Sequence, residues 1–305
     1  MLPVDASWLA VYNPSPAVVL REVGHVTRGL LAAVFWHDPL RAGGKTAWGA
    51  ASLAGLTAGL GRGIGAGALP LVFALAYLVH HLPPILAHGT PALWAGAQLG
   101  SAAGLWLALQ PDWTAVRHGD GQTARLGALA ATALPAALLR FWLHNLTGQL
   151  EAAATVGLLL VGTGLLLAAA RQAVPAVSEG EPPALPPWLA GAGGIAAGLV
   201  ALPGISLVAV FWATAIAGRL PRAEALRFAL LAAAPTAALG GLLWLPAAVG
   251  HGIAPALPAA LGACGGAWAG ARLLRYWVAR DDGAGWIGLC SALGALLLVL
   301  GVFAS

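Results

Sequence analysis

Arg62 is the residue whose type and setting point most directly to chemistry. It interrupts an otherwise charge-poor window, residues 46–79, within the glycine-rich run GLGRGIGAG. A charge in apolar, membrane-like surroundings is costly and by default indicates function, here contact with an anionic headgroup. A guanidinium beside free backbone amides offers several N–H donors to phosphate oxygens. The structural alternative is that Arg62 reaches the membrane interface or pairs with a carboxylate.

A second candidate site lies in the middle of residues 188–218, WLAGAGGIAAGLVALPGISLVAVFWATAIAG, which contain no charge. As one helix this segment would run to roughly 46 Å, beyond the ~30 Å bilayer core. The pair Pro203 and Gly204 is expected to break it, and broken membrane helices commonly carry binding sites. Pro203, Gly204 and Ser206 are therefore candidate substrate-binding residues, with Ser206 also the candidate catalytic residue. The alternatives are a plain Pro-Gly turn and a Ser206 that caps the following helix.

No metal site is predicted. His80 and His81 are adjacent, so their imidazoles do not face one way on a helix, and a zinc site needs three or four convergent ligands. Cys264 and Cys290 lie in apolar spans without CxxC spacing and are expected to be small core residues.

Other polar residues of the spans have more ordinary interpretations. Gln98 and Ser101 are expected to bond a neighbouring helix rather than a ligand. His144 and His251 lie in connections between spans; they could flank a site, but exposed loop histidines are the alternative.

The composition indicates a polytopic membrane protein. Hydrophobic residues make up 59% of the 305-residue chain and charged residues only 9%, with a mean hydropathy of +0.82. A soluble globular domain carries about 25% charge. The net charge of +4 comes from basic residues in short connections, which favours membrane orientation over nucleic-acid binding. Membrane lipid is the expected partner, nucleic acid is excluded, and a homodimer is left open.

The chain divides into four parts. Residues 1–44 form an N-terminal extension in which 17–36 are typical of an amphipathic interfacial helix. Two membrane repeats, 45–171 and 188–305, flank a polar linker at 172–187.

The two repeats share a plan. Each has a broken window, a span, a span with a central proline (Pro135 or Pro235), and a further span. Besides the windows, the predicted spans are 92–109, 126–143, 152–170, 228–250, 252–271 and 283–303. The expected fold is an all-α polytopic bundle of two related halves, each with a re-entrant helix pair plus transmembrane helices. The breaks near 58–70 and 200–207 are expected to meet at its centre.

Lys and Arg set the predicted orientation. The connections 110–125 and 272–282 are basic, whereas 144–151 and 249–254 contain no Lys or Arg. The basic connections should face the cytoplasm, in a plasma (inner) membrane.

Several motifs, in order along residues 48–303, resemble the undecaprenyl-diphosphate phosphatase (bacitracin-resistance) family, which is bacterial. ALPGIS followed by RLPRAEALRFALLAAAPTAALGGLL is similar to the Pro-Gly turn and proline-bearing helix of that family's second half. AQLGSAAGLWLAL, from Ala97, resembles its Gln-Leu-Gly-Ser helix. GARLLRYWVARDDGAGWIGLCSALGALLLVLG resembles its last loop and helix. The resemblance implies the two-repeat membrane fold and a polyprenyl diphosphate substrate.

The family's catalytic residues are mostly absent. The resemblance implies two Glu four residues apart, but Ala58 and Arg62 stand there. Leu71 or its neighbours replace a His, and Leu207–Ala209 replace Arg-Ser-Gly. Carboxylates hold metal or move protons and Arg neutralises phosphoryl oxygens, so this chemistry is degraded. No cofactor is evident, because the carboxylates that would hold the family's divalent cation are missing.

Two functions remain open. One is a phosphatase-like protein that acts on or binds a polyprenyl (di)phosphate lipid carrier. The other is a non-catalytic transporter or binding protein for a lipid phosphate or small anion. Acidic residues converging near Arg62 would favour the enzyme, and Arg62 without them would favour anion binding.

Overall fold

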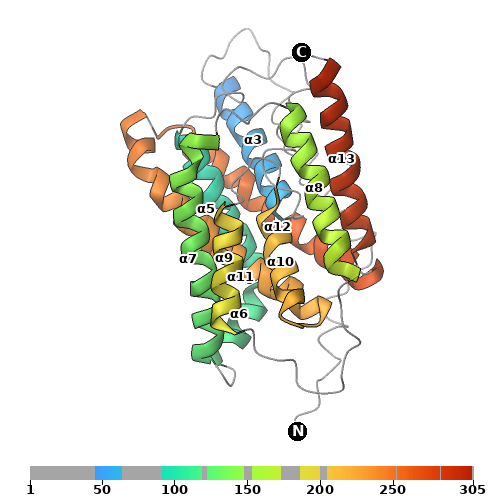
Figure 1. The fold of residues 1–305 in the computed structure, drawn as a ribbon. Coiled ribbons are helices and arrows are strands. Elements are labelled where there is room, and N and C mark those ends of the chain that lie inside the picture. Colours follow the sequence, from blue (N-terminus) through green and yellow to red (C-terminus); the bar gives the residue numbers. More distant parts are fainter. Residues whose placement is uncertain are drawn as a thin grey trace.

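The computed structural model describes residues 45–63, 91–118, 122–147, 153–172, 186–199, 205–251, 253–281 and 283–303. Within these ranges every regular element is an α-helix (Figure 1). The helices are α3 (Lys45–Gly63), α5 (Pro91–Ala108), α6 (Gln110–His118), α7 (Gln122–Thr147), α8 (Ala153–Gln172), α9 (Pro187–Leu199), α10 (Leu207–Ala217), α11 (Arg222–His251), α12 (Ala256–Asp281) and α13 (Ala284–Phe303). The expected extension 1–44 lies outside the described residues.

Three of these helices are long and apolar enough to cross a membrane: Thr123–Leu143, Ala154–Gln172 and Arg222–Gly250. Many large apolar side chains point outward, such as Trp142, Leu158 and Leu165, the last two at helical spacing on one face of α8. Hydrocarbon-facing surfaces have this composition, since lipid tails impose no penalty on exposed Leu or Trp. The prediction of an all-α membrane protein is confirmed at this level.

Helix α12 lies between α3 and α5 because small residues let the backbones approach closely. Glycines spaced four apart form a row along one face of α3 and another along α5; we call these rows the glycine ridges. An added Cβ at any of these glycines would overlap the α12 backbone. These glycines are Gly55, Gly59 and Gly63 on α3 and Gly96, Gly100 and Gly104 on α5. This packing fixes the end of α3 beside α5.

The remaining helices pack around this trio. Helix α11 packs along the other side of α5, α7 packs on α9, and α8 lies beside α13 at the right of Figure 1. The predicted prolines Pro135 and Pro235 lie inside α7 and α11. The largest buried side chains include Phe211 and Trp212 of α10 and Trp286 of α13; they belong to the main core, where the Trp212 ring packs against that of Trp286.

The window 188–218 is broken, as predicted. Helix α9 has 13 residues and α10 has 11, with residues 200–206 between them. At ~1.5 Å per residue each spans at most about 20 Å, too short to cross a bilayer alone. Residues 200–204 and 64–70 lie outside the described residues, and so does the expected meeting of the two breaks.

One difference from the sequence-based expectation is α6. Residues 110–118 were expected to belong to a connection, yet they form a nine-residue helix with Asp112 in its first turn. A carboxylate near a helix N-terminus is favourable because it faces the unpaired backbone N–H groups.

Candidate anion-binding site

Arg62 lies in the last turn of α3 and reaches across to α5. Its Nη1 donates to the carbonyl oxygen of Ala97 at 3.2 Å and to the hydroxyl of Ser101 at 3.1 Å. Ser101 is fully buried, and its own hydroxyl donates to Ala97 O at 2.6 Å. Both bonds of Arg62 use the same nitrogen. Its Nε and Nη2, which can also donate, have no hydrogen-bond partner among the described residues.

The glycine ridges explain why Arg62 reaches α5. Gly63, its neighbour, lies against the backbone of α12 around Ala267, and Gly104 of α5 lies against Cys264 of the same helix. With α3 and α5 both held against α12, the Arg62 stem has only a short gap to cross. Gln98, also on α5, instead contacts Gly240 of α11. Ser101 therefore bonds a neighbouring helix as predicted, and its partner is Arg62.

Arg140 of α7 is the second cation of this site. Its positive charge acts on that of Arg62, so the two guanidinium groups repel each other, and both side chains are half-buried. Neither is fully buried, so some of their surface stays accessible. Among the described residues no hydrogen bond or ion pair engages the Arg140 guanidinium. Two half-buried like charges repel each other, and an anion bound between them would relieve that repulsion.

Sequence reasoning did not single out Arg140. It follows Pro135 by five residues and precedes Phe141 and Trp142, and an arginine beside aromatics at a span end is typical of an interfacial anchor. The available signal was that Arg140 is the one charge within the span 126–143.

Asp112 and Glu224, the two acidic residues whose side chains the structure describes, are engaged elsewhere. Asp112 of α6 pairs with Arg275 of α12 through Oδ2 and with Arg227 of α11 through Oδ1, at 2.9 Å from the arginine Nε. Glu224 lies 3.6 Å from Arg227. The network ties α6, α11 and α12 together at one end of the bundle. Within the described part of the chain, no acidic residue lies near Arg62 or Arg140.

Ser206 has a structural role as a helix cap. Its Oγ accepts a hydrogen bond from the backbone N–H of Ala209 at 3.2 Å, which makes it the N-cap of α10. Its own N–H donates to the hydroxyl of Thr163 in α8, and its exposure is 1%. This is the capping arrangement that stood as the alternative to a phosphate contact. Pro203 and Gly204 lie outside the described residues.

Apolar packing occupies the other positions of the family's catalytic motifs. Ala58 is buried between Ala97 of α5 and Ala263 of α12. Val208 and Ala209 are buried in the main core. A carboxylate at residue 58 would have to enter this small-residue contact, whereas the small side chain of alanine fits the close packing of α3. Leu71 lies outside the described residues.

The described residues offer no metal centre, since no three His, Cys, Asp or Glu side chains converge among them. Cys264 and Cys290 are unpaired thiols, the second buried. The histidines 80–81 and the side chains of His144 and His251 lie outside the described residues. The chemistry this site supports is electrostatic: two guanidinium groups can hold an oxyanion by charge-assisted hydrogen bonds.

Comparison of the chain with protein-family models and with curated proteins finds no match.

Proposed function

We propose that this chain is an integral membrane protein with an undecaprenyl-diphosphate phosphatase-like fold, in which the hydrolytic residues are lost and a polyprenyl phosphate lipid is bound. The observation that carries the proposal is the pair Arg62 and Arg140, two cations on apolar helices with no described carboxylate beside them. Ionisable groups within membrane helices are expensive and commonly mark ligand or ion pathways.

The ligand class follows from the donors. Arginine presents planar N–H pairs that match the oxygens of phosphate better than a point charge does. The apolar outer surface suits a ligand whose tail stays in the hydrocarbon while its headgroup reaches Arg62. Two arginines with no described carboxylate near them favour binding over hydrolysis, because no described group there could move a proton or hold a metal.

The localisation is part of the proposal. We place the basic segments 110–125 and 272–282 on the cytoplasmic side of a bacterial inner membrane. The expectation that 272–282 is a loop is wrong, because residues 272–281 continue helix α12. The Asp112–Arg275 ion pair supports this placement by bringing these two basic segments to the same end of the bundle.

Binding to protein in nanodiscs of zwitterionic lipid tests the proposal. Polyprenyl phosphate should bind the wild-type chain, and Arg62→Ala should weaken binding roughly 10- to 150-fold, the loss of one charge-assisted hydrogen-bonding group. Arg62→Lys should fall between them, because the charge survives but the fork geometry does not. Ser101 keeps its bond to Ala97 O in either variant, so no buried hydroxyl is orphaned.

Arg125→Gln is the matched control. Arg125 is an exposed arginine at the start of α7, and its loss removes the same charge without touching the site. Equal binding by wild type and Arg62→Ala, or an equal loss in the control, would refute the proposal. Tight Arg62-dependent binding of inorganic phosphate without preference for the lipid would favour the alternative function, a small-anion carrier.

A further inference from the structure

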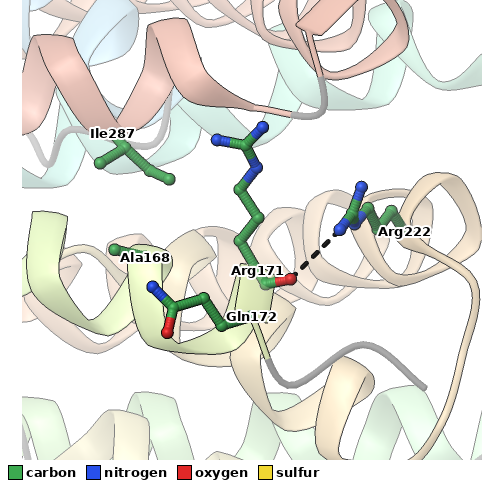
Figure 2. A pocket seen from close by; sticks show the side chains of 5 residues that line it. All are labelled: Ala168, Arg171, Gln172, Arg222 and Ile287. Atoms are coloured by element: carbon green, nitrogen blue, oxygen red, sulfur yellow. Dashed lines mark hydrogen bonds between the residues drawn. The ribbon is translucent and has the colours of Figure 1, made fainter.

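A basic pocket lies at the opposite end of α8 from its start at Ala153. Its volume is about 480 Å³, within the range of small-molecule sites. Figure 2 shows the five side chains that line it: Ala168, Arg171, Gln172, Arg222 and Ile287. Helices α8, α11 and α13 each contribute, so the pocket lies where three helices converge. Its polar lining is two guanidinium groups and one amide.

Arg222 is held rigidly at this pocket. Its Nη2 donates to the carbonyl oxygen of Arg171 at 3.1 Å, in the last turn of α8 (Figure 2). Its own carbonyl accepts from the indole Nε1 of Trp212 at 3.3 Å, and Trp212 packs edge-on against Trp286. The bond to α8 has a structural reason of its own, since a cation satisfies the free carbonyls of a helix C-terminus.

That explanation does not extend to Arg171. Its side chain leaves α8 and extends toward the segment that carries Ile287, on the other side of the pocket (Figure 2). No described residue forms a hydrogen bond or ion pair with its guanidinium. The carboxylates of Asp112 and Glu224, the acidic side chains that the structure describes, pair with Arg227 and Arg275 instead. Two cations thus line one pocket: Arg222 is fixed in place, and the Arg171 guanidinium has no partner in the part of the chain that the structure describes.

We infer that this pocket binds a phosphate group, with Arg171 and Gln172 as donors and Arg222 as the fixed wall of the site. It is separate from the Arg62–Arg140 site and independent of the proposed function. The phosphate can belong to an anionic lipid headgroup at the membrane surface or to a soluble phosphate, which present the same oxygens. Charge-assisted bonds from arginine are the strong, geometrically selective contacts for either.

The test uses the purified full chain and two arms. In the first, inorganic phosphate is titrated onto protein in phosphatidylcholine nanodiscs and followed by calorimetry. In the second, native mass spectrometry counts phosphatidylglycerol retained after exchange from mixed micelles. Arg171→Gln should weaken binding at this site about tenfold or more, since one charged donor group is lost. Arg171 makes no side-chain bond to a described residue, so the variant should fold.

Arg125→Gln, an exposed arginine outside the pocket, should bind like wild type within about twofold. Arg171-dependence in the lipid arm alone identifies a headgroup site, and in the phosphate arm alone a soluble phosphate site. Wild-type binding by Arg171→Gln in both arms, or the same loss in Arg125→Gln, overturns the inference. The Arg62→Ala variant should keep Arg171-dependent binding, which separates this result from that of the proposed function.

Discussion

The close contact between α3 and α12 gives the sharpest prediction about the scaffold. Gly59 faces Ala263 of α12, and a methyl group added there would overlap the Ala263 carbonyl oxygen and lie 2.6 Å from its Cα. Backbone cannot rotate away as a side chain can, so Gly59→Ala must push the two helices apart. Overpacking of this kind costs about 1–3 kcal/mol. Alanine also gains about 1 kcal/mol of helix propensity over glycine, which hides part of the loss.

Gly127→Ala on α7 is the matched control, because no atom lies within 4 Å of its added Cβ. It receives the same propensity gain without the clash, so the difference between the two variants isolates the overpacking. We expect Gly59→Ala to unfold about 1–3 kcal/mol more easily than Gly127→Ala. The measurement is reversible unfolding in mixed micelles, with helicity as the signal. Equal stability of the two variants would refute the packing of α3 against α12.

Three further outcomes are expected. The wild-type chain should release no phosphate from a polyprenyl diphosphate, with or without a divalent cation, because groups that act together in hydrolysis are missing; turnover in a standard phosphate-release assay would show that other residues have taken over. Ser206→Ala should cost about 1 kcal/mol of stability through the lost cap of α10 and leave Arg62-dependent binding intact, and a binding loss as large as that of Arg62→Ala would restore Ser206 as a ligand residue. Asp112→Asn should destabilise by about 1–3 kcal/mol, less in high salt, because Arg227 and Arg275 lose their shared counterion; an unchanged unfolding curve at low salt would contradict this.

The helical scaffold was largely predictable from the sequence. Runs of apolar residues about as long as a bilayer is thick predict spans, and α5, α8 and α13 begin and end within a few residues of the predicted limits. The pair Pro203 and Gly204 predicted a break in the window 188–218, because proline lacks a backbone N–H and glycine disfavours a helix. Among the described residues, the break is seen at Ser206, which caps the start of α10.

Of the two arginines of the site, the sequence predicted only one. Arg62 was identifiable because its charge interrupts an apolar window. Arg140 was not, because its role depends on how α7 lies relative to α3, and nothing local to residue 140 encodes that. The same holds for Asp112, whose two arginine partners lie more than a hundred residues away in sequence.

The glycine ridges are also only partly predictable from the sequence. Glycines four apart on α3 are visible in the sequence and predict close contact with some helix. The helix that packs against the glycines of α3 is α12, whose small residues lie about two hundred positions later in the sequence. Helices pack by matching surfaces, and the pairing is a property of the assembled bundle.

The stability of Arg140→Gln with and without polyprenyl phosphate tests the central claim most directly. If Arg62 and Arg140 form one anion site, the variant without ligand should unfold at a higher temperature than wild type, because the repulsion between two like charges is removed. Ligand at about 100 times its Kd should stabilise wild type by about 2.7 kcal/mol and the variant by much less. A variant that is less stable than wild type without ligand, and equally stabilised by it, would contradict the account.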